Sequence, residues 1–297
     1  MVKRLISAYA SEILQMNKNE LFESIKASEG RVILAENVCT RFPVGFDISN
    51  AEVSRAFGAD LILLNAFDVF NPHIEAINSE NPIKKLKELI ARPVGINLEP
   101  VDENVKMLEN RLEIPEGRKA TEKTFKKANQ LGLDFICLTG NPGTGVTNKE
   151  ISKAIKLASS IFNGLIIAGK MHKSGVDEEI IDLDAINEFI ENGADIILLP
   201  ACGTVVGVDI DEVKEACKLI RKKGKLSMSA IGTSQEGSQP EVIREIALLN
   251  KRAGVDIHHI GDAGYSGVAP YLNILELSRT IRGDRHTIRT IAASVNR

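Results

Sequence analysis

The sequence predicts an α/β fold, a closed barrel of eight parallel strands that alternate with helices. A repeat indicates this fold, because four segments share a glycine, one further residue and an aspartate ahead of an apolar run: GADLILL (58–64), GLDFICL (132–138), GADIILL (193–199) and GVDIHHI (254–260). The glycine can end the preceding helix in a left-handed turn, and an unbroken apolar run suits a strand buried on both faces.

The spacing of the repeats predicts a further strand between successive copies. The last three copies begin at residues 132, 193 and 254, and each interval has room for two strand–helix units. Four more apolar runs fill the gaps: RVILAEN (31–37), PVGINLE (93–99), GLIIAGK (164–170) and KLSMSAIGT (225–233). Eight strands alternating with helices over about 250 residues describe a closed (β/α)8 barrel. An open doubly wound sheet is the alternative, but it would leave edge strands that the sequence does not protect.

Helix signals separate the strands. Ser49, Thr121 and Asn148 are suited to cap helices that start directly after them, and the Asn81–Pro82 step suits another helix start. The helices of the seventh and eighth units begin beside prolines, where a missing amide proton costs least. We therefore expect one domain over 1–297, with a barrel core at about 31–283, an N-terminal helical segment at 1–30 and a C-terminal tail at 284–297.

Two segments outside the regular pattern each have two interpretations. The long charged loop at 101–120 follows the third strand, and it is either a lid over the mouth of the barrel or a solvated loop. The tail carries Ile288, Ile291 and Ala292 at helical spacing. These side chains pack either on a neighbouring subunit or on the chain's own barrel, and we expect a homo-oligomer.

Composition narrows the classes of partner. The 297 residues are 43% hydrophobic and 26% charged, with a formal net charge of -3, so no concentrated basic face attracts nucleic acid or anionic lipid. No apolar stretch approaches the roughly 18 residues of a membrane span. The four cysteines form no close pair, which fits a reducing compartment. We expect a cytoplasmic protein without nucleic-acid or membrane partners.

The site of a barrel enzyme is built from residues that follow the carboxyl ends of the strands. Several polar side chains lie within or against the apolar runs at these ends, where an unpaired polar group is costly. We predict catalytic roles for four of them and ligand binding for three asparagines and a threonine: Glu36, Glu99, Lys170 and His172, then Asn65, Asn97, Asn141 and Thr139. Alternatively, these polar side chains satisfy one another in a closed network that needs no ligand.

Lys170 and His172 are two residues apart in a predicted strand and should project to the same side. Lys170 would then form a Schiff base with a carbonyl substrate or stabilise an enolate, while Glu99 or His172 carries the proton. Alternatively, Lys170 is the counterion of Glu99 or Glu36. Adjacent His258 and His259 point to opposite sides of their strand, so at most one lines the interior.

Three carboxylates allow a second chemistry. Glu36, Glu99 and Asp262 would hold a divalent cation such as Mg²⁺ through oxygen ligands and leave open positions for metal-assisted hydrolysis. A non-catalytic, ligand-sensing or assembly-factor barrel is the third possibility.

Glycine-rich loops follow the seventh and eighth strands, GTSQEGSQP (232–240) and GDAGYSGVAP (261–270). Small residues let backbone amides approach an anion, and in barrels these two loops most often bind phosphate. We predict phosphate binding by Gly232, Thr233 and Ser234 and by Gly261, Asp262 and Gly264. A third loop of this kind, TGNPGTGVTN (139–148), either binds another anionic group or is a plain turn.

The repeats GADLILLNAF, LDFICLTGNPGTGVT and GADIILLPACG and the GDAGYSG loop resemble the phosphate-binding (β/α)8, or TIM-barrel, enzymes, and their order is similar to that of the BtpA-like branch. The resemblance covers about residues 31–283. The chain is also loosely similar to phosphoenolpyruvate mutase and isocitrate lyase, but it lacks the lysine-cysteine-glycine-histidine loop of those enzymes.

Members of such uncharacterised barrel families often carry a haloacid-dehalogenase-type label. The segment VVGVDIDEV (205–213) resembles the nucleophile motif of haloacid-dehalogenase-like hydrolases, with Asp209 and Asp211 at its two aspartate positions. Asp209 and Glu212 also suit a helix cap.

These observations together predict an enzyme that acts on a small phosphorylated metabolite, a sugar phosphate in the first instance. The expected chemistry is that of a lyase, aldolase or isomerase, by carbon–carbon cleavage or proton transfer beside a carbonyl.

Overall fold

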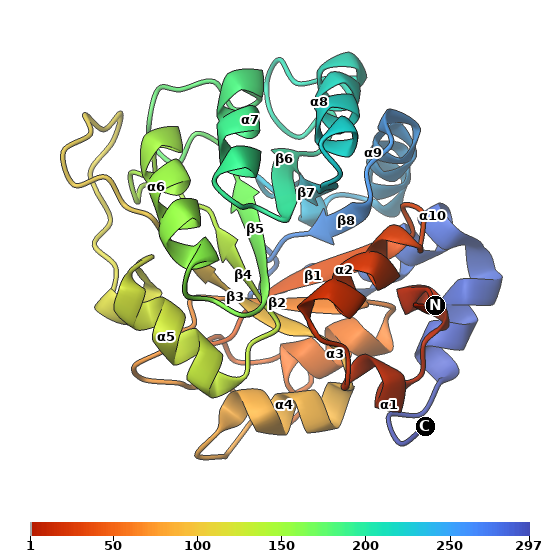
Figure 1. Cartoon of the computed structure of the whole chain (residues 1–297). Helices are drawn as coiled ribbons and strands as arrows, with labels where there is room; N and C mark the ends of the chain where they lie inside the picture. Colours follow the sequence, from red (N-terminus) through yellow and green to blue (C-terminus); the bar gives the residue numbers. More distant parts are fainter. Residues whose placement is uncertain (1) are drawn as a thin grey trace.

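A computed structural model describes residues 2–297, and in them the chain forms the predicted closed barrel (Figure 1). Each strand pairs in parallel with its neighbours in chain order, and β8 closes the ring on β1. The strands are β1 Val32–Val38, β2 Leu61–Asn65, β3 Val94–Leu98, β4 Phe135–Leu138, β5 Leu165–Gly169, β6 Ile196–Pro200, β7 Leu226–Ile231 and β8 Ile257–Ile260.

The principal helices surround the barrel (Figure 1): α3 Asn50–Ala56, α4 Pro82–Ile90, α5 Glu122–Leu131, α6 Asn148–Ser159, α7 Leu183–Glu191, α8 Ile210–Lys222, α9 Pro240–Ala253 and α10 Tyr271–Ala292. The short elements are α1 Ala10–Ile13, α2 Lys18–Lys26, and the 3₁₀ turns Leu5–Ser7, Glu116–Arg118 and Gln235–Gly237. Ser49 and Thr121 cap α3 and α5 as predicted. The cap of α6 is Thr147 and not Asn148, because the Thr147 side chain accepts the amide of Glu150.

The aspartate of the repeat has a specific role in the fold. Each copy accepts a backbone amide at the start of a neighbouring strand: Asp60 from Ile33, Asp134 from Val94, Asp195 from Ile166 and Asp256 from Ser227, at 2.8–3.0 Å. The repeat therefore joins the strands in pairs at the amino-terminal end of the barrel. The glycine–aspartate pattern is thus structural, and it lies at the end opposite to the site.

Side chains alternate between the barrel interior and the surrounding helices. Leu34, Leu63 and Ile167 belong to the inner apolar cluster, whereas their neighbours Ile33 and Ile166 belong to the outer one. The N-terminal segment adds Leu5, Ile13, Leu21 and Ile25 to the inner cluster. This segment therefore closes one end of the barrel, and the interior toward the carboxyl ends of the strands is left for polar side chains.

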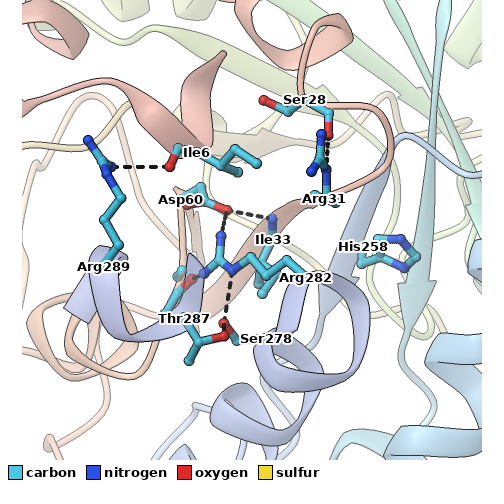
Figure 2. Close-up of polar contacts among 12 residues, drawn as sticks. Ile6, Ser28, Arg31, Ile33, Asp60, His258, Ser278, Arg282, Thr287 and Arg289 are labelled. Carbon is cyan, nitrogen blue, oxygen red and sulfur yellow. Dashed lines mark hydrogen bonds and ion pairs between the residues drawn. The ribbon is translucent and has the colours of Figure 1, made fainter. Parts of the chain in front are cut away.

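The C-terminal helix is anchored to the barrel by a buried ion pair (Figure 2). Arg282 of α10 donates to Asp60 Oδ2 at 2.6 Å and to Ser278 Oγ at 2.9 Å, and both charged side chains are almost completely buried. Gly283 kinks α10 with a φ of 73°. Beyond the kink, Arg289 donates to the backbone oxygens of Ile6 and Ser7.

The tail therefore packs on its own chain, and the two ends of the chain lie close together (Figure 1), with the Ser11 amide 2.8 Å from the Arg297 oxygen. Ile288 remains 63% exposed and Ile291 36% exposed. A contact of Ile288 with a second subunit stays a prediction. Within residues 2–297, no helix has the length and apolar character that crossing a membrane requires.

Candidate functional site

The polar side chains predicted from the strand ends continue the inward-facing rows of the barrel. Glu36 follows Leu34 by two residues, Asn65 follows Leu63, and Thr139 follows Cys137, and the apolar member of each pair belongs to the inner cluster. Alternation along a strand therefore directs all three polar side chains toward the axis. They meet at the carboxyl ends of the strands, where barrel enzymes carry their sites.

These residues line a cavity of about 400 Å³. Nine of the ten predicted ligand-binding residues contribute to it, together with two of the predicted catalytic residues: Asn65, Asn97, Thr139, Asn141, Gly232, Thr233, Ser234, Gly261 and Asp262, then Glu36 and His172. Gly264 does not line it. A Cβ at Gly264 would lie 1.9 Å from the Val268 oxygen, so only glycine allows the backbone of the loop to approach itself this closely.

Glu36 lies in the cavity wall with both oxygens hydrogen-bonded. Asn97 Nδ2 donates to Oε1 at 2.5 Å, and His259 Nε2 lies 2.9 Å from Oε2. His259 points into the barrel and is fully buried, whereas His258 points outward and lies 3.2 Å from the Gly30 oxygen. The prediction that at most one of the two histidines faces the interior is therefore confirmed, and the structure adds its partner, Glu36.

Asp262 is held at the cavity by Asn65, whose Nδ2 donates to Oδ2 at 2.8 Å. Burial, and then the nearby Glu36 carboxylate, raise the pKa of Asp262 well above its ordinary value. Glu236, which also lines the cavity, has its pKa raised mainly by burial. Asp262, whose pKa lies well above its ordinary value, is thereby suited to retain a proton at a higher pH than an exposed carboxyl group would.

Glu99 does not line this cavity, contrary to its predicted catalytic role. Arg118 donates to Glu99 Oε1 at 2.7 Å, and the Asn141 amide donates to Oε2 at 2.8 Å. Asn141 in turn exchanges hydrogen bonds with Asn65 at 2.9 and 3.1 Å. Glu99 therefore holds Asn141 in position from behind the cavity wall.

Lys170 also lies outside the cavity. The strand β5 ends at Gly169, which continues the inward row of Leu165 and Ile167, so Lys170 falls on the opposite side. Its Nζ donates to Glu178 Oε2 at 2.5 Å, and its side chain is 1% exposed. Burial lowers the pKa of Lys170, and Glu178 opposes that shift. The counterion is thus Glu178 and neither Glu99 nor Glu36.

His172 does line the cavity, so the prediction that it projects with Lys170 is wrong. The Ser174 amide donates to His172 Nδ1 at 3.0 Å. Burial lowers the pKa of His172, which favours the neutral ring. With Nδ1 accepting a hydrogen bond, the proton of the neutral ring lies on Nε2.

The loop after β7 has an unusual backbone at the cavity. Thr233 and Ser234 are consecutive non-glycine residues with φ values of 55° and 68°, a conformation that costs energy and is enriched at functional sites. Their amides donate to no acceptor within residues 2–297. The Thr233 hydroxyl donates to the Thr204 oxygen at 2.6 Å, so its amide, and not its hydroxyl, is free for an anion.

Three buried polar atoms at the cavity have no hydrogen-bond partner among residues 2–297. They are Asn97 Oδ1, Thr139 Oγ1 and Glu236 Oε2. Because buried polar atoms are almost always paired, these atoms indicate a ligand or water that completes them. Glu236 was not singled out from the sequence; its signal was an acidic residue inside a loop of small residues.

The predicted metal ligands do not converge. Glu99 is engaged by Arg118 and Asn141 outside the cavity, so it cannot join Glu36 and Asp262. Among residues 2–297, no group of three or more histidine, cysteine, aspartate or glutamate side chains is arranged to hold a metal ion. Asp209 caps α8 through the amide of Asp211 at 2.9 Å, and neither aspartate lines the cavity.

A family model described as Domain of unknown function (DUF7916) matches residues 6–297. The chain belongs to this family. No curated protein matches the DUF7916 chain.

Solved structures similar to the DUF7916 barrel share its fold. A 2,3-dimethylmalate lyase, described as a PEP mutase/isocitrate lyase superfamily member, has a TM-score of 0.50 and 12% identity over 84% of this chain and 81% of its own. An archaeal fructose 1,6-bisphosphate aldolase has a TM-score of 0.56 and 17% identity over 89% of this chain and 99% of its own. The barrel part of the predicted resemblance is confirmed; the BtpA-like branch and the haloacid-dehalogenase-type label are not.

Proposed function

We propose that this protein is an enzyme that transfers protons beside the carbonyl group of a small phosphorylated metabolite, in a reaction of the lyase, aldolase or isomerase class. The observation that carries the proposal is the convergence of Glu36, Asp262 and Glu236 on one cavity with different hydrogen-bonding environments. Carboxyl groups that lie in one site but in different environments are suited to act as acid and base.

Glu36 is the proposed base. Asn97 Nδ2 donates to one of its oxygens and His259 Nε2 lies 2.9 Å from the other, which fixes the orientation of the carboxyl group in the cavity wall. A carboxylate held in this way can take a proton from the carbon beside a carbonyl group.

Asp262 is the proposed acid. Asn65 donates to its Oδ2, so a retained proton lies on Oδ1. A protonated carboxyl group in a buried site can donate a hydrogen bond to the carbonyl oxygen and stabilise the enolate that forms. His172, with its proton on Nε2, is a second donor at the cavity.

The phosphate group is assigned to the loop after β7, where the amides of Thr233 and Ser234 face no protein acceptor within residues 2–297. Backbone amides are suited to bind an anion. The substrate body would then extend toward the unpartnered Asn97 Oδ1 and Thr139 Oγ1, which accept hydrogen bonds from hydroxyl groups. The names of the two similar structures, a lyase and an aldolase, agree with this class of reaction.

The test uses dihydroxyacetone phosphate, which has one carbonyl group, exchangeable protons beside it and one phosphate group. We expect the enzyme to exchange these protons with ²H₂O, followed by NMR. Glu36→Gln and Asp262→Asn should each lower the rate at least 100-fold, within the usual range for loss of an acid or a base. Asp211→Asn, at an exposed position of α8, is the matched control and should leave the rate unchanged.

Absence of exchange with a panel of phosphorylated ketones and aldehydes, despite their binding, would instead favour a ligand-sensing barrel. Borohydride reduction in the presence of the ketone should form no adduct at Lys170, because Glu178 holds its amine outside the cavity. Dependence of turnover on added Mg²⁺ would favour the divalent-cation alternative.

A further inference from the structure

Two of the three loops that resemble anion-binding turns face carboxyl groups of the chain itself. In the loop after β8, the Ala263 amide donates to Glu236 Oε1 at 3.0 Å. A Cβ at Gly261 would lie 2.5 Å from the same oxygen, so the carboxyl group is packed directly against this loop. Glu236 Oε1 thus occupies the position in which an oxygen of a bound phosphate group would accept a hydrogen bond from the Ala263 amide.

Helix α10 fixes Glu236 in this position. Asn273 Nδ2 donates to the backbone oxygens of Glu236 and Ser238, both at 2.8 Å, and Asn273 is 2% exposed. Glu236 itself is also 2% exposed. Because both its backbone and one side-chain oxygen are engaged, Glu236 cannot leave the β8 loop at low cost.

A second carboxyl group faces the loops on the other side of the cavity. Glu109, from the long loop after β3, lines the cavity. Its Oε1 lies 3.3 Å from the position of a Cβ at Gly175 and 3.6 Å from that of a Cβ at Gly143. The glycine-rich turn after β4 therefore has an acidic neighbour, whereas the amides at 233 and 234 remain free of protein acceptors in residues 2–297.

We propose that the cavity admits a ligand with a single phosphate group, held at residues 232–234, and that Glu236 is the specificity-determining residue that excludes a second phosphate from the β8 loop. Glu236 Oε2, which has no partner within residues 2–297, instead accepts a hydrogen bond from a hydroxyl group of the ligand. This inference rests on the proposed function for the assignment of the phosphate loop.

The physical reason is like-charge repulsion in a site with little water. A second phosphate group at the β8 loop would have to displace Glu236 from the Ala263 amide or bind beside it. Either arrangement leaves anionic groups close together, and Lys173, the lysine in the cavity wall, is already paired with Asp177. Close like charges are strongly unfavourable when they are partly buried. A hydroxyl group at the same place supplies the missing donor and carries no charge.

Binding of fructose 6-phosphate and of fructose 1,6-bisphosphate, measured by calorimetry, tests this inference. The wild-type chain should bind the monophosphate at least tenfold more tightly, and titration with inorganic phosphate should give one site per chain. Glu236→Gln, which keeps the shape but removes the charge, should reduce the preference to threefold or less. Glu236→Asp should retain this preference. Glu241→Gln, an equal charge change at an exposed position of α9, is the control.

Equal or tighter binding of the bisphosphate by the wild type would overturn the inference. So would two inorganic phosphate sites, no inorganic phosphate site, or the same effect from Glu236→Gln and Glu241→Gln. The readout is binding and not turnover. Failure of proton exchange with the monophosphate preference intact would therefore count against the proposed function alone, and exchange without that preference would count against Glu236 alone.

Discussion

His258 makes the stability of the barrel depend on pH. Burial holds the pKa of His258 at about 4, against an ordinary value of 6.5, because the ring lies between the barrel and its helices with the Gly30 oxygen as its polar partner. The folded state therefore favours neutral His258, and the unfolded state binds the proton more tightly. The stabilisation is fully present above pH 6.5 and is lost as the pH falls toward 4.

The size of the effect follows from these two pKa values. Linkage gives a loss of about 2 kcal/mol of unfolding free energy between pH 7.5 and pH 5, and about 3 kcal/mol by pH 4. The chain has no tryptophan, so urea unfolding is followed by far-UV circular dichroism. His258→Gln, which can still donate to Gly30 but does not titrate, should lack this loss.

Burial also raises the pKa values of Glu236 and Asp262, so these carboxyl groups add their own pH dependence. The informative quantity is therefore the difference between wild type and His258→Gln at each pH. Parallel curves for the two proteins from pH 7.5 to pH 4 would refute the assignment of a neutral, buried His258.

Further predictions concern the packing of the barrel. Arg282→Met should lower the unfolding free energy by about 3–5 kcal/mol, because it leaves the Asp60 carboxylate buried without its cation. Urea unfolding measures this loss, and a midpoint equal to that of the wild type would contradict the prediction. The control Arg279→Met, in an exposed ion pair, should leave the midpoint unchanged. Gly95→Ala should cost about 1–3 kcal/mol, because its Cβ would lie 2.2 Å from the Phe135 ring; a stable variant with unaltered thermal unfolding would argue against this packing.

The barrel itself was predictable because its signal is local and repeated. The glycine ends a helix, the aspartate accepts an amide of a neighbouring strand, and the apolar run forms the strand, as at Asp60 and Ile33. The inward positions of Asn97 and Thr139 were predictable for the same reason, since alternation along a short strand fixes the direction of each side chain. Both residues lie in the cavity wall.

The errors arose where strands end and where distant segments meet. Lys170 has the outward parity of Ile166 and Ala168, so its amine lies away from the cavity. Because β5 ends at Gly169, alternation does not extend to His172, which turns into the cavity. Glu99 continues the inward row of its strand, but its amide pairs with the Arg118 oxygen, and this draws it out of the cavity. That pairing depends on a partner 19 residues away, which periodicity cannot reveal.

The same limit applies to Glu236 and His259. The sequence places His259 next to His258 but does not indicate that Glu36, 223 residues away, is its partner. Likewise, Glu236 lies inside a loop of small residues, and only the closure of the barrel brings it to the Ala263 amide. The hydrogen-bonded pairs of the cavity wall are therefore products of the tertiary fold.

A crystal structure with bound dihydroxyacetone phosphate tests the central claim most directly. We expect the phosphate group within hydrogen-bond distance of the amides of residues 233 and 234, and the carbonyl end of the molecule between Glu36 and Asp262. A ligand bound at Lys170, or a phosphate group on the Ala263 amide with Glu236 displaced, would contradict this account of the site.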